Sequence, residues 1–77
     1  MAPVFLKRYD PEARINRWYR VAIQPTLLDP IAVICSWGSL STSFMQARII
    51  PMDSFDHARK TAQAIVESKK KRGYWVA

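Results

Sequence analysis

The hydrophobic pattern of this chain changes its period once, near Asp53, and this change restricts the folds that the chain can adopt. Before Asp53, apolar residues gather in short runs that alternate with polar ones or are bounded by turn residues, which is typical of strands. After Asp53, apolar residues recur at steps of three and four, which is typical of an amphipathic helix. The apolar stripe of this helix consists of Phe55, Ala58, Ala62, Ile65 and Val66. The order predicts an α+β fold, an antiparallel sheet of about four strands with one C-terminal helix packed on it.

Prolines and turn-forming residues separate the predicted strands. We expect strands at residues 4–9, 18–24, 31–37 and 44–50. The first two flank the turn sequence DPEAR and are expected to form a hairpin. The third is apolar on both parities, which favours a central strand and leaves open which face of the sheet Trp37 occupies. Small polar residues at 38–43 predict a turn, and Pro51 closes the fourth strand.

The ends of the predicted helix carry the residues that such ends favour. Asp53 or Ser54 can act as the N-cap, and Asp56 in the first turn suits the positive end of the helix dipole. The basic run at 69–72 lies in the last turns, and Gly73 is expected at the C-terminal cap.

The length of 77 residues allows one small domain, so we expect residues 1–77 to fold as a single unit. Twelve basic against six acidic residues give a net charge of +6. This excess favours a polyanionic partner, with nucleic acid ahead of an acidic membrane surface or an acidic protein. Cys35 is the only cysteine, which excludes an intramolecular disulfide and a cysteine-rich zinc site, and its apolar neighbours predict burial.

Features of an enzyme, a cofactor protein or a membrane protein are absent from the sequence. His57 is the only histidine and has no partner motif, and two glycines in all cannot supply a phosphate-binding loop. We therefore expect no catalytic residues, no metal and no cofactor. The apolar run at 4–6 is too short for a signal-peptide core, and no segment approaches the ~20 apolar residues of a membrane span. A cytoplasmic location without membrane contact is the expectation.

Four features in this order resemble the WGR domain, a module named for a Trp-Gly-Arg tripeptide. They are the opening YDPEARINRWYRVAI, the apolar strand that runs into Trp37-Gly38, the helix start MDSFDHA and the ending KKKRGY. The resemblance is strongest to short, single-domain bacterial members. It implies a compact antiparallel sheet with one helix and, from the copies in poly(ADP-ribose) polymerases, recognition of DNA breaks by stacking of the motif tryptophan, here Trp37. The motif arginine is replaced by Ser39, and glycines usual after the motif are replaced by Ser41 and Phe44.

Two functions follow as hypotheses. The first is a small non-enzymatic nucleic-acid-binding module that recognises DNA ends or backbone without reading sequence. Its candidate site residues are Trp37, Gly38, Ser39, Arg48, Arg17, Arg20, Lys69, Lys70, Lys71 and Arg72. Core packing of Trp37 and solvation of the helix end by the basic run are the alternative interpretations of these residues. Because Arg17 and Arg20 are three apart on a strand, they are expected on opposite faces.

The second hypothesis is a protein-interaction or structural domain that has lost DNA binding. Here the sheet face opposite the helix would meet a protein partner, and the apolar Phe44 and Met45 after the motif are its signature. Binding to a blunt DNA duplex at low salt separates the two.

Overall fold

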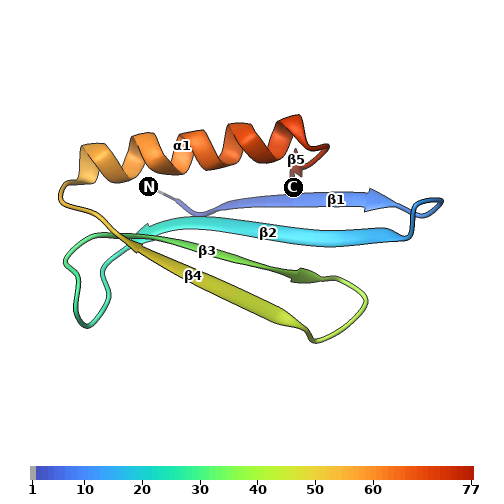
Figure 1. The fold of residues 1–77 in the computed structure, drawn as a ribbon, viewed down its shortest axis with the longest axis horizontal. Helices are drawn as coiled ribbons and strands as arrows, with labels where there is room; N and C mark the ends of the chain where they lie inside the picture. The colour runs from blue at the N-terminus through green and yellow to red at the C-terminus, as the bar shows by residue number, and fades with distance from the viewer. Residues whose placement is uncertain (1) are drawn as a thin grey trace.

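The computed structural model describes residues 2–77, which form a five-stranded antiparallel sheet with one helix along one of its faces (Figure 1). The elements are β1 (Val4–Asp10), β2 (Ile15–Gln24), β3 (Ala32–Ser39), β4 (Met45–Pro51), α1 (Phe55–Lys71) and β5 (Trp75–Val76). The strand order is β4-β3-β2-β1-β5. The predicted fold class is confirmed, and the predicted number of strands is one too few. Strand β5 has only two residues, which is too short to produce a recognisable alternation.

The β1–β2 hairpin forms where the turn sequence predicts it, but β2 begins at Ile15 rather than at residue 18. The turn is held by the Asp10 carboxylate, which accepts from the Ala13 N–H, and by the Pro11 carbonyl, which accepts from the Arg14 N–H. Arg14 completes the reversal with a φ of 56°. Because this turn is tight, Asp10 pairs directly with Ile15 and the hairpin is longer than the alternation at 18–24 indicates.

Strand β3 continues through Trp37 and Gly38 to Ser39, so the predicted turn at 38–43 begins only at residue 40. Both residues are paired on each side of the strand: Trp37 lies between Tyr19 and Gln46, and Gly38 lies between Trp18 and Met45. Tertiary pairing therefore overrides the turn preference of glycine.

Helix α1 covers the sheet face that carries the large buried side chains. This core contains Leu6, Tyr19, Val21, Val33 and Cys35 from the sheet, against Ala58, Ala62 and Val66 from the helix. Burial of Cys35 confirms its prediction. Ala58 and Ala62 are fully buried, and their small side chains let the helix lie close to the strands.

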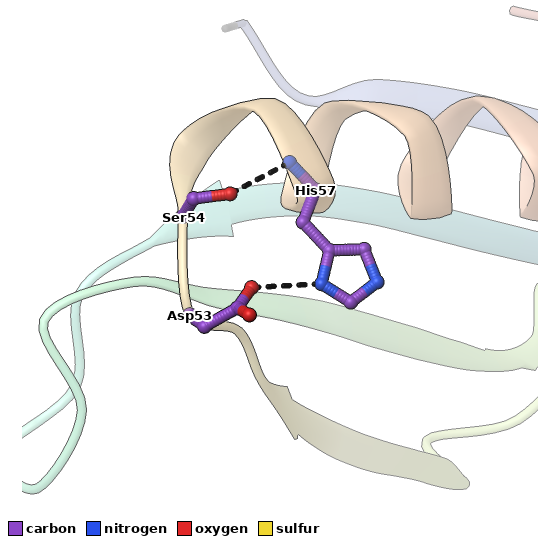
Figure 2. A network of polar contacts seen from close by, with 3 residues as sticks. All are labelled: Asp53, Ser54 and His57. Carbon is purple, nitrogen blue, oxygen red and sulfur yellow. Dashed lines mark hydrogen bonds and ion pairs between the residues drawn. The ribbon is translucent and has the colours of Figure 1, made fainter.

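The helix ends confirm the predicted caps. Ser54 is the N-cap, and its hydroxyl accepts from the His57 N–H at 3.1 Å (Figure 2). The Asp53 carboxylate meets His57 Nδ1 at 2.8 Å beside it. At the other end Gly73, with a φ of 95°, follows the C-cap residue Arg72 and turns the chain into β5.

Within residues 2–77, no helix lies on the opposite face of the sheet, and the two sheet edges differ in length. One edge is β4, with seven residues, and the other is β5, with two. All of β4 except Ile50 is exposed. No helix within residues 2–77 is long and apolar enough to cross a membrane.

Candidate functional site

A hollow of about 500 Å³ lies on the helix-bearing side of the sheet, where α1 ends. We call it the basic hollow; it is lined by Arg17, Trp18, Tyr19, Trp37, Gly38, Ser39, Phe44, Arg48, Lys69 and Tyr74. Strands β2, β3 and β4 and the last turns of the helix all contribute. The β1–β2 and β3–β4 turns extend past the helix end on this side of the molecule (Figure 1).

Trp37 borders both the core and the basic hollow. Its ring stacks in parallel on the ring of Tyr19, its partner across the strand pair, with centroids 5.7 Å apart and planes 10° apart. The register places both on the helix-bearing face, which decides the question that the sequence left open. Trp37 remains partly exposed while Tyr19 beneath it is buried. The indole is therefore supported by the core without being sealed under the helix.

Three cations line the basic hollow, Arg17, Arg48 and Lys69, and no aspartate or glutamate lines it. Arg17 and Arg48 are exposed. The Lys69 Nζ lies 4.4 Å from the ring centroid of Tyr19 and 5.7 Å from that of Tyr74, which is a cation–π arrangement. Burial, and next the charge of Arg72, lower the pKa of Lys69. Burial raises the pKa of Tyr19, so its phenol stays neutral below the Lys69 ammonium.

Gly38 occupies a position without room for a side chain. A Cβ there would collide with the main-chain oxygen of Phe44 and would lie 3.0 Å from Nε1 of Trp18. The glycine thus lets the Trp18 indole and the end of the β3–β4 turn close over the strand. Next to it, the Ser39 hydroxyl accepts from the Ser41 N–H at 3.0 Å, so Ser39 orders the turn beside the basic hollow.

The structure separates the remaining candidate residues into two groups. Arg20 faces the opposite side of the sheet from Arg17, as their spacing predicts, and it does not share the basic hollow. Of the basic run at 69–72, Lys69 lines the basic hollow, whereas Lys70, Lys71 and Arg72 are exposed and do not. Lys70 also meets Glu67 at 3.4 Å.

Sequence reasoning missed one cation near this surface. Arg8 lies directly across the strand pair from Arg17, so it points to the same face. Its side chain passes Gly73, where a Cβ would lie 3.3 Å from Nε. The hairpin register could have revealed Arg8, because it pairs Arg8 with Arg17. That register follows from the sequence only when the exact position of the turn is known.

The polar residues that could form a metal site or a carboxylate–imidazole pair are few in the described part of the chain. Within residues 2–77 there is no group of three or more His, Cys, Asp or Glu that could hold a metal ion. The one carboxylate–imidazole pair, Asp53 and His57, is exposed at the N-terminus of the helix (Figure 2). Its geometry is that of a helix start, with Ser54 as the cap.

Fold and site together define a small binding domain with one basic, aromatic surface. The WGR domain model matches residues 2–77, and the chain belongs to this family. WGR domains are generally nucleic-acid-binding modules and are not themselves catalytic. The chain is also 27% identical over 71 residues to Uncharacterized protein y4dW of Sinorhizobium fredii. The matched stretch covers 92% of this chain and 34% of the relative. It thus spans about a third of the relative's length. No solved structure matches it significantly.

Proposed function

We propose that this domain binds DNA without catalysis and recognises duplex ends or the sugar-phosphate backbone without reading sequence. The observation that carries the proposal is the basic hollow, where a partly exposed indole stands among three cations and no carboxylate. Protein surfaces that hold nucleic acid combine cations for the phosphates with aromatic rings for a base or sugar. Both are present within one hollow.

Each part of the hollow has a role in this proposal. Arg17 and Arg48 meet phosphates, and Lys69 adds positive charge from the end of the helix. Trp37 offers its ring to a base or sugar at a strand end. Because Ser39 stands in place of the motif arginine, the phosphate contacts are made by Arg17 and Arg48 on the neighbouring strands β2 and β4. The exposed run Lys70, Lys71 and Arg72 extends the positive surface past the helix end.

The test is a mobility-shift series on blunt, nicked and hairpin-closed duplexes of one sequence. We expect the blunt duplex to bind more tightly than the closed one. We expect Trp37→Ala to weaken binding to open ends by about 1–3 kcal/mol, the range for one stacked aromatic. Trp75→Ala is the matched control, because Trp75 is exposed and does not line the basic hollow. Thermal unfolding checks that both variants are folded.

Three outcomes would contradict parts of the proposal. Equal binding to open and closed ends would exclude end recognition. Unchanged binding by folded Trp37→Ala would exclude stacking on this residue. Absence of any shift at low salt would instead support the alternative, a domain that has lost DNA binding.

A further inference from the structure

The sheet face without the helix, here called the far face, carries an apolar hollow of about 680 Å³. It is lined by Phe5, Leu6, Lys7, Trp18, Arg20, Ser36, Leu40, Met45 and Ala77. Phe5 is 52% exposed and Met45 is 62% exposed, and Ile49 extends the apolar surface along β4. A solvated face of an antiparallel sheet normally carries polar side chains at these alternate positions. Exposed apolar side chains gathered around one hollow are typical of interaction surfaces.

The charges on this hollow are all of one sign. Lys7 and Arg20 line it, and no aspartate or glutamate does. The Arg20 guanidinium lies 5.7 Å from the ring centroid of Phe5, so positive charge stands directly beside the apolar surface. A complementary partner therefore combines apolar side chains with neighbouring carboxylates.

Two other occupants fit less well. A second copy of this chain would bring the same cations against Lys7 and Arg20, with a net charge of +6 on each copy. A nucleic acid would cover the apolar side chains with a charged backbone, while the basic hollow offers it three cations on the other side of the sheet.

We infer that the far face docks an acidic, amphipathic protein segment, whose apolar side chains fill the hollow and whose carboxylates meet Lys7 and Arg20. The segment binds on the side of the sheet opposite to the basic hollow. Combined with the DNA binding proposed above, this docking would let the domain hold DNA and a protein at the same time. This inference does not depend on DNA binding, since no cation is shared between the two hollows.

The probe is a fluorescein-labelled synthetic peptide of about ten residues that alternates leucine with glutamate, a period that puts apolar and acidic side chains on opposite sides of a strand. We expect saturable binding by fluorescence anisotropy. We expect a matched peptide with lysine in place of glutamate to bind at least about tenfold more weakly. Amide chemical-shift changes in the protein should centre on Phe5, Arg20, Ser36 and Met45, which line only the far-face hollow.

Variants assign the binding to this surface. Met45→Glu and Arg20→Glu should each weaken peptide binding by about tenfold or more, because the new carboxylate would be buried against the carboxylates of the peptide. Leu27→Glu is the control, because Leu27 is fully exposed in the β2–β3 loop and does not line the hollow. Trp37→Ala should lose DNA affinity and keep peptide affinity, so the two proposals fail separately.

Several results would overturn the inference. They are no binding of the glutamate peptide at millimolar concentration, equal binding of the lysine peptide, and shift changes centred on Trp37. Unchanged affinity in Met45→Glu and Arg20→Glu would do the same. A dimer in sedimentation equilibrium that Met45→Glu abolishes would identify a second copy as the occupant instead.

Discussion

The Trp37 indole lies on the Tyr19 ring as its direct neighbour across β2 and β3, 5.7 Å between centroids. Tyr19 is in turn fixed by burial, by an edge contact with Tyr74 at 6.3 Å between centroids, and by Lys69 above its ring. Because this fixed ring supports the indole, Trp37 has little rotational freedom left to lose in the stacking that we propose. The position of Trp37 is therefore set before any ligand arrives.

The salt dependence of DNA binding should distinguish the two faces of the sheet. DNA affinity falls as salt is added, and each phosphate contact steepens that fall. Because we propose that Arg48 contacts a phosphate, Arg48→Gln should make the slope of log affinity against log salt less steep by about 0.9. Arg20→Gln removes the same charge from the far face and should leave the slope unchanged. Blunt-duplex titrations between roughly 50 and 200 mM salt measure both. An equal reduction of the slope in both variants would mean that only the net charge of the domain determines its salt dependence.

Gly38→Ala should lower the free energy of unfolding by about 1–3 kcal/mol, the usual cost of forcing a methyl group into an occupied space. The new Cβ meets the Phe44 main chain and the Trp18 indole. Ala47→Val is the control, because Ala47 is exposed on the same face of the neighbouring strand, and it should stay within about 0.5 kcal/mol. Urea unfolding of both variants provides the comparison. Equal stability of Gly38→Ala and the unaltered protein would show that the strand has room at this position.

Two alanines of the helix should respond differently to enlargement. Ala62 is fully buried against the sheet, so Ala62→Leu should destabilise the domain by about 1–3 kcal/mol. Ala64 is exposed on the same helix, and Ala64→Leu should change stability by about 0.5 kcal/mol or less. Leucine and alanine both favour helices, so intrinsic propensity differs little. Thermal unfolding measures both, and a similar loss in the two variants would contradict the observed helix orientation.

The Asp53–His57 pair should make a pH-dependent contribution to stability. The hydrogen bond from His57 holds the pKa of Asp53 below its ordinary value. A carboxylate of this kind stabilises the fold above its unfolded-state pKa, and the contribution is lost as pH falls through the lowered folded-state value. Asp53→Asn should therefore lower the midpoint of thermal unfolding at neutral pH, and this difference should vanish at about pH 2.

Ser54→Ala is the control for that experiment. The hydroxyl of Ser54 does not titrate, so removing this cap should cost about 1 kcal/mol at either pH. A difference between Asp53→Asn and the unaltered protein that persists unchanged in acid would exclude the titration of the Asp53 carboxylate as its source.

The sequence predicted the features that depend on local pattern. The change of period near Asp53 gave the helix, Ser54 was one of two predicted N-caps, and alternation gave the strand cores. Because successive residues of a strand point to opposite faces, the sequence also placed Arg17 and Arg20 on different faces of the sheet. These features follow from neighbours along the chain, so no knowledge of the tertiary structure was needed.

Features that depend on distant partners were missed or misplaced. Gly38 was predicted in a turn, yet it pairs with Trp18 and Met45 inside the sheet. Strand β5 exists only because β1 offers it a hydrogen-bonding edge. Arg8 joins Arg17 through register, which depends on the exact length of the turn between them.

The unequal edges of the sheet limit how copies of this domain could join through their strands. Head-to-tail growth into a fibre requires a usable edge on both sides of each copy. Strand β4 provides seven residues, whereas β5 provides only two before the sheet stops. Because β4 is the longest strand edge, we expect strand addition between copies to pair β4 with β4 around a two-fold axis, which ends at a pair.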